Sequence, residues 1–176
     1  MVLWKDGAFA EDPWRILEDG APLPEAEAVI VSLARWRAEQ AALRERQGRL
    51  GLLIPPGENW SDVLPDLHRF EVIAVTIPKY ADGRAFSIAR LLRQRDGFTG
   101  EIRAVGDYIV DQIPLMRRVG IDAFFLTDPI VIRALERGDW PEVRHYLQPV
   151  DDRREVPAGT RPWARRPGAD AKGRPS

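Results

Sequence analysis

A polar loop that follows an apolar run carries the residues of this chain best suited to chemistry. The run 72–77, VIAVTI, is followed by Lys79, Asp82 and Arg84 within the segment PKYADGR. In open α/β folds, ligands bind just beyond the carboxyl ends of the strands. Two cations, a carboxylate and a glycine there suit a sulfate, phosphate or carboxylate group, helped by the start of the following helix. The loop therefore predicts an anion site and leaves the ligand open.

Further polar residues extend this candidate site. Ser87 and Arg90 lie three residues apart on the predicted helix and share a face. Arg103 falls inside a predicted strand, where a buried charge is costly without a partner. We expect it to pair with a carboxylate: Asp82, Asp107 or Asp111. The candidate anion-binding residues are Lys79, Arg84, Ser87, Arg90 and Arg103.

Acid–base chemistry has two candidates, Asp82 and Asp107, each at a junction between a strand and a helix. Either could exchange protons with a substrate anion that the loop holds. The alternative for both, and for Asp128, is a structural N-cap that satisfies free backbone N–H groups. For Asp128, the following Pro129 favours the cap. For Asp82 and Asp107 the sequence leaves both roles open.

The loops after the other apolar runs bring polar side chains to the same predicted edge. Parallel strands end at one edge of their sheet, so the loops that follow them meet there. These loops contribute Glu58, Asn59, Tyr80, Thr127 and Asp128. No GxGxxG, GxxxxGKS/T or GxSxG motif follows a strand, so no nucleotide cofactor and no hydrolase nucleophile is predicted.

Cysteine is absent, which excludes disulfides, thiol redox centres and cysteine-ligated iron–sulfur clusters. The two histidines, His68 and His145, fall in separate predicted helices. No metal site is predicted, because a structural zinc ion needs four ligands together. A redox role would need an organic cofactor or a partner that holds the redox centre.

The overall charge is nearly balanced, with 26 basic and 27 acidic side chains and a formal net charge of -1. Such a chain generates no strong field toward nucleic acid or an anionic membrane, so neither is expected as a partner. No apolar run is long enough to span a bilayer, and the first residues, MVLWKDGAFAEDPW, do not resemble a secretory signal. A cytoplasmic location is expected.

Apolar runs alternate with helix-forming segments along most of the chain. Strands are predicted at 28–33, 50–54, 72–77, 101–105 and 122–126. Helices are predicted at 36–47, 84–95, 108–119, 129–137 and 141–147, with a further short helix that Ser61 caps. This alternation predicts an α/β fold, with about five mostly parallel strands in an open or partly curled sheet.

Three segments make up the predicted domain organisation. Residues 28–150 form a single α/β domain, and residues 1–27 pack on it as an N-terminal segment. Residues 151–176 are rich in proline, glycine and arginine and predict a disordered tail. Within the tail, Trp163 is the residue suited to docking on the domain or on a partner.

A series of ordered motifs resembles a known bacterial family. Residues 78–124 contain DGR-x-x-S-x-A-R-x-L-R, then G-E-x-R-A-x-G-D, then D-Q, then a glycine before D-A-F. These motifs closely resemble those of domain of unknown function 934. Ala85 replaces a glycine expected in this family, and Pro114 replaces an ordinary helix residue and predicts a kink. The matching positions are Lys79, Asp82, Gly83, Arg84, Ser87, Arg90, Arg103, Gly106, Asp107, Asp111 and Gln112.

The resemblance implies a role in sulfur assimilation. Members of the family are described as oxidoreductases, or accessory proteins, of assimilatory sulfite reduction, a description that rests on neighbouring genes. No catalytic residues come with the resemblance. The partners it implies are sulfite reductase or another sulfur-assimilation protein, together with a small anion.

Two functions of different class follow. The first is an accessory protein of assimilatory sulfite reduction that binds an anionic ligand or the sulfite reductase machinery and holds no redox centre of its own. The second is a stand-alone enzyme for a small anionic substrate. In that enzyme Asp82 or Asp107 would act as acid and base, while Lys79 and Arg84 would hold the substrate.

Overall fold

The structure, a computed structural model, describes residues 2–139, 155–158 and 161–167. Strands and helices alternate along most of this length. In chain order the elements are β1 (Val2–Lys5), β2 (Ala8–Ala10), β3 (Trp14–Ile16), β4 (Ala28–Ser32), α1 (Leu33–Ala38), α2 (Gln40–Glu45), β5 (Leu50–Ile54), η1 (Ser61–Arg69), β6 (Val72–Ile77), α3 (Arg84–Gln94), β7 (Glu101–Gly106), η2 (Val110–Gln112), α4 (Ile113–Arg118), β8 (Ala123–Leu126), α5 (Pro129–Glu136), β9 (Glu155–Ala158) and β10 (Arg161–Pro167).

Eight strands form one mixed sheet in the order β2-β1-β8-β7-β6-β5-β4-β3. Strands β3 to β8 run parallel to one another, and β1 pairs antiparallel with both β8 and β2. Strands β4 to β8 are the five predicted from the sequence, with ends that differ by one residue at most. The α/β fold class is therefore confirmed.

The N-terminal segment supplies three strands that the sequence did not predict, so the sheet has eight strands where about five were expected. β1, β2 and β3 are only three or four residues long, and every residue of β2 is exposed. They lack the longer apolar run that marks a buried strand. Instead, β1 and β3 form by pairing with β8 and β4, the outer strands of the five-stranded parallel region.

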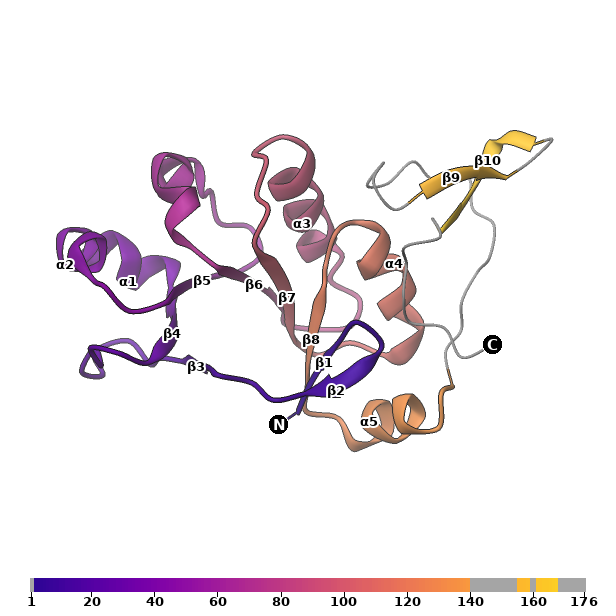
Figure 1. Cartoon of the computed structure of the whole chain (residues 1–176), viewed down its shortest axis with the longest axis horizontal. Helices are drawn as coiled ribbons and strands as arrows, with labels where there is room; N and C mark the ends of the chain where they lie inside the picture. The colour runs from indigo at the N-terminus through magenta and orange to yellow at the C-terminus, as the bar shows by residue number, and fades with distance from the viewer. Residues whose placement is uncertain (1, 140–154, 159–160, 168–176) are drawn as a thin grey trace.

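Chain geometry around β2 and β3 requires the sheet to be curled. The two strands lie at opposite edges, seven strand spacings apart, which is about 34 Å in a flat sheet. Ala10, at the end of β2, and Trp14 are only four residues apart, and an extended chain covers about 14 Å over that length. The two edges must therefore approach each other. In Figure 1 the indigo segment runs from β2 directly to β3.

Side chains of the parallel strands alternate between two buried faces, which explains their continuous apolar runs. The outer face packs against the helices, and Val31, Ile73 and Phe124 belong to this larger core. The inner face, which the curl encloses, forms a second core cluster around Trp14 and Ile30. The curl thus replaces the second layer of helices that a flat parallel sheet would need.

Helix starts differ in detail from the predictions. The helix predicted at 36–47 begins earlier, because Ser32 accepts a hydrogen bond from the Arg35 N–H, and it divides into α1 and α2. Pro114 lies in the first turn of α4, where the missing N–H has no partner to lose, so the predicted kink is wrong. Ser61 is the first residue of η1 and not its cap.

The segment predicted as a disordered tail contains β9 and β10, which pair antiparallel as a separate two-stranded sheet. Trp163 lies in β10. The rest of that segment, the helix predicted at 141–147 and His145 lie outside the described residues.

Candidate functional site

The loops after β5, β6, β7 and β8 follow the carboxyl ends of neighbouring parallel strands, as predicted, so they share one edge of the sheet. Three candidate residues lie elsewhere: Ser87 and Arg90 on α3, and Arg103 within β7. The edge carries Glu58, Asn59, Lys79, Tyr80, Asp82, Arg84, Asp107, Thr127 and Asp128.

Asp82 and Arg84 pair with each other at the start of α3. The Arg84 Nη2 lies 2.6 Å from Asp82 Oδ2, and its Nε lies 2.9 Å from Oδ1. The Asp82 carboxylate also accepts a hydrogen bond from the Arg84 backbone N–H at 3.1 Å. The hydrogen bonds from Arg84 lower the pKa of Asp82 to about 2. Asp82 is therefore ionised at neutral pH and balances the charge of one predicted anion-binding cation.

The other surface candidates on this side of the sheet do not form a cluster with that pair. Lys79 is exposed, and its side chain has no hydrogen bond or ion pair within the described residues. Arg90 donates from Nε to the Oε1 of Gln94 on the same helix at 2.9 Å. Ser87 is exposed. No described contact therefore joins Lys79, Ser87 or Arg90 to the Asp82–Arg84 pair.

Arg103 is buried on the inner face of the sheet, where it pairs with residues that the sequence analysis did not consider. Its Nη1 lies 2.7 Å from Asp12 Oδ2, and its Nε lies 2.9 Å from Glu101 Oε1. Glu101 also accepts a hydrogen bond from Lys5 Nζ at 2.8 Å. Arg103 occupies the middle of β7, whereas the expected partners follow the strand ends. The prediction was therefore wrong for all three of them, Asp82, Asp107 and Asp111.

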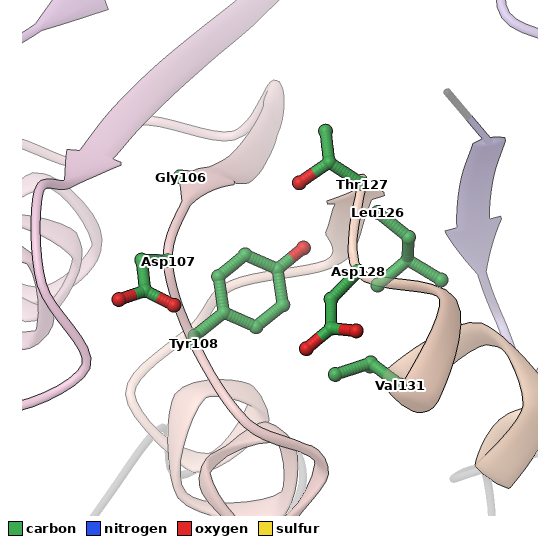
Figure 2. Close-up of a pocket in the computed structure, with 7 residues that line it drawn as sticks. All are labelled: Gly106, Asp107, Tyr108, Leu126, Thr127, Asp128 and Val131. Carbon is green, nitrogen blue, oxygen red and sulfur yellow. The ribbon is translucent and has the colours of Figure 1, made fainter.

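A small cleft of about 130 Å³ opens between the ends of β7 and β8. It is lined by Gly106, Asp107, Tyr108, Leu126, Thr127, Asp128 and Val131. Figure 2 shows the Tyr108 ring between the carboxylates of Asp107 and Asp128. The Tyr108 hydroxyl donates to the Phe125 carbonyl at 2.9 Å, and burial raises the pKa of Tyr108. Tyr108 is thus a fixed, neutral wall of the cleft.

The two carboxylates of the cleft differ in their contacts. Asp128 caps α5, as predicted, because its Oδ1 accepts a hydrogen bond from the Ile130 N–H at 2.7 Å. The Asp107 carboxylate is exposed and has no hydrogen bond or ion pair within the described residues. The N-cap role that the sequence offered for three aspartates therefore holds for Asp128. Asp82 precedes Gly83, the N-cap of α3, and accepts the Arg84 N–H from there. Asp107 is left available to a ligand.

Gln112 joins the loop after β6 to the loop after β7. Its Nε2 donates to the Tyr80 carbonyl at 2.7 Å, while its Oε1 accepts from the Ile109 N–H at 3.1 Å. One amide side chain thus holds two loops of the edge together.

The loop after β5 is engaged with α1. Arg37 lies 3.3 Å from Glu58 and also donates to the carbonyl of Asn59 and to Asp62. The two polar residues predicted for this loop are therefore used in contacts within the protein.

The described residues show no grouping of three or more His, Cys, Asp or Glu side chains suited to a metal ion. None of the helices in the described part of the chain is long and apolar enough to cross a membrane.

One family model matches residues 51–156, more than half of the chain, and its description is bacterial protein of unknown function (DUF934). The chain belongs to this family. The match confirms the resemblance seen in the motifs, and it covers β5 to α5 with every loop of the edge. No curated protein and no solved structure matches the chain.

The sequence analysis missed two groups of residues. Tyr108 and Ile109 were assigned to the first turn of a helix, although they precede η2 and face the cleft and solvent, respectively. Asp12 and Lys5, the partners of the buried charges on β7, lie far from them in sequence. Apolar residues directly after Asp107, at the predicted edge of the sheet, are a weak signal for the first group. No local signal identifies the second.

Proposed function

We propose that this DUF934 protein is an accessory protein of assimilatory sulfite reduction that acts by binding the sulfite reductase machinery. The pathway is taken from the way members of this family are described, which rests on neighbouring genes. The observation that carries the binding role is the Asp82–Arg84 ion pair. In this pair, the carboxylate best placed for acid–base chemistry in the loop is bonded to the cation beside it.

The charges at the edge support binding over catalysis. A general acid or base works best when its pKa lies near the working pH, and the pKa of Asp82 is about 2. Arg90 and Arg103, two further cations of the predicted anion site, are bonded to other side chains. We therefore place the sulfite reductase machinery ahead of a small anion as the binding partner.

The first test is growth of a deletion strain on sulfate, sulfite or sulfide as the sole sulfur source. Growth that only sulfide restores is expected, because sulfide is the product of sulfite reduction. Equal growth on all three sources would exclude a required role in this pathway.

A stand-alone enzyme is the second candidate. The observation that favours it is the Asp107 carboxylate in the cleft, which has no partner among the residues that the structure describes. Its chemistry would combine an acid–base carboxylate with Lys79 and Arg84, which would hold the substrate anion. Asp107→Asn and Arg84→Ala variants that are folded by circular dichroism and still support growth would count heavily against that enzyme. Purified protein that binds neither flavin nor nicotinamide would limit an oxidoreductase role to electron transfer through a partner.

A further inference from the structure

Exposed apolar side chains gather at the carboxyl edge of the sheet. Within the described residues, the three most exposed large hydrophobic side chains are Ile130 (68%), Tyr80 (59%) and Ile109 (43%). They follow β8, β6 and β7, respectively. Single exposed apolar residues are ordinary, but several at one place mark an interaction surface.

Contacts within the edge place these three residues around the cleft. Gln112 bonds to the backbone of both Tyr80 and Ile109, so these two residues are neighbours. Ile109 directly follows Tyr108, which lines the cleft. On the other side of the cleft, the Asp128 carboxylate accepts the Ile130 N–H. We define the edge surface by Tyr80, Asp107, Ile109, Asp128 and Ile130.

The edge surface is acidic. The Asp82 and Arg84 charges balance each other. The other charged side chains between β6 and α5 that follow the strand ends are one cation, Lys79, and three carboxylates, Asp107, Asp111 and Asp128. Opposed charges favour association and repel wrong partners. A cationic group therefore complements this surface, and a sulfate or phosphate does not.

The size of the cleft indicates what enters it. Sites for small molecules commonly enclose about 300–1,000 Å³. The cleft here has a volume of about 130 Å³. It suits one side chain of a larger partner better than a whole substrate.

We infer that the edge surface docks a segment of a partner protein in which a lysine or arginine is flanked by apolar side chains. The cation enters the cleft that Asp107, Tyr108 and Asp128 line, and the apolar neighbours cover Ile109, Ile130 and Tyr80. This inference rests on the proposed function, since it names the surface through which the protein would bind sulfite reductase.

Binding of the full-length protein to purified sulfite reductase from the same bacterium tests the inference. Calorimetry is done at low and high salt with wild type, Asp107→Asn and Ile130→Ser. Each substitution is expected to weaken the affinity by about tenfold or more, the effect of losing a central interface contact. Asp107→Asn is also expected to reduce the dependence of affinity on salt, because it removes a charge. Leu91→Ser, at an exposed leucine on α3, and Glu136→Gln, at an exposed carboxylate of α5, are the matched controls and should bind like wild type.

The outcomes separate the two proposals. Binding that Asp107→Asn and Ile130→Ser leave unchanged overturns the edge surface while the proposed function stands. No binding by the wild-type protein also overturns the inference, and growth of the deletion strain then decides the proposed function independently.

A second measurement tests the chemistry of the segment. A photo-crosslinking phenylalanine analogue at position 130 is expected to join a sulfite reductase peptide that contains a lysine or arginine beside apolar residues. The same analogue at position 91 is the control. A crosslinked peptide without a cation would overturn the inferred recognition.

Discussion

A single glycine at the end of β7 sets the path of the chain into the cleft. Gly106 has a φ of +122°, which residues with a side chain rarely adopt. A Cβ atom at this position would lie 2.2 Å from the Ile77 carbonyl oxygen on the neighbouring strand. Both the backbone angle and this close approach require glycine, and together they position Asp107 at the edge.

Replacement of this glycine should therefore be costly. Gly106→Ala is expected to lower the free energy of unfolding by about 3 kcal/mol, from backbone strain and the clash with Ile77. Gly97→Ala is the control, because Gly97 also has a positive φ but has nothing within 4 Å of the added Cβ. We expect that control to cost about 1 kcal/mol. Urea unfolding measures both, and equal losses would contradict the steric argument.

The Asp82–Arg84 pair predicts how one carboxyl group titrates. The pKa of Asp82 is about 2 in the folded protein, below its ordinary value of 3.8. Because the folded pKa is depressed, the pair contributes to stability above about pH 3.8 and loses that contribution as the pH falls toward 2. Carbon-detected NMR of the Asp82 carboxyl should give a midpoint near 2, and Arg84→Gln should raise it toward 3.8. Lys79→Gln is the control and should leave the Asp82 midpoint unchanged. If Arg84→Gln does not move the midpoint, Arg84 is not the cause of the lowered pKa.

At the scale of elements, Gln112 couples the loop after β6 to the segment that leads into α4. Gln112→Ala removes the acceptor of the Ile109 N–H and the donor to the Tyr80 carbonyl. Hydrogen exchange at the Ile109 amide should accelerate by about tenfold, as expected when a local hydrogen bond of about 1.4 kcal/mol is lost. Exchange at Leu92, in the last turn of α3, should not change.

Gln112→Glu separates the two bonds. A glutamate keeps an oxygen that accepts from the Ile109 N–H but has no N–H to donate to Tyr80. The Ile109 amide should then stay protected while the loop after β6 gains mobility. Fast exchange at Ile109 in both variants would contradict the proposed division of roles.

At the scale of the whole molecule, a buried ion pair fastens the N-terminal segment across the curled sheet. Asp12 follows β2 and precedes β3, and its Oδ2 contacts the Arg103 Nη1 at 2.7 Å on the inner face of β7. The Arg103 side chain is almost fully buried. Removal of one partner from a buried pair leaves an uncompensated charge and is strongly destabilising.

Asp12→Asn tests this connection. The substitution keeps an acceptor for the Trp14 N–H, which Asp12 Oδ1 accepts at 3.1 Å. It removes the charge and replaces the oxygen that accepts from Arg103 with an NH2 group, which cannot accept. Because Glu101 still pairs with Arg103, we expect the free energy of unfolding to fall by about 2–3 kcal/mol. Asp139→Asn, which breaks the exposed pair with Arg137, should cost less than about 1 kcal/mol. Similar losses in the two variants would show that burial of Arg103 contributes little.

Local patterns in the sequence were sufficient for much of the fold and for the place of the site. The apolar runs located β4 to β8, and Asp128 with Pro129 located the start of α5. The parallel order then located the edge with Asp82, Arg84 and Asp107. These features follow from burial on both faces and from capping within a few residues, which depend on neighbours in the chain.

Only the tertiary structure decided how the sheet curls, which strands complete it and where each charge finds its partner. β1, β2 and β3 form through backbone pairing with distant strands, and Arg103 is neutralised by Asp12, ninety-one residues away. The exposure of Tyr80, Ile109 and Ile130 likewise depends on which loops meet. The sequence by itself determined which segments are buried strands and helices, because the local spacing of apolar residues specifies these elements. The pairing of distant groups is a property of the folded chain, since it depends on the geometry that brings them together.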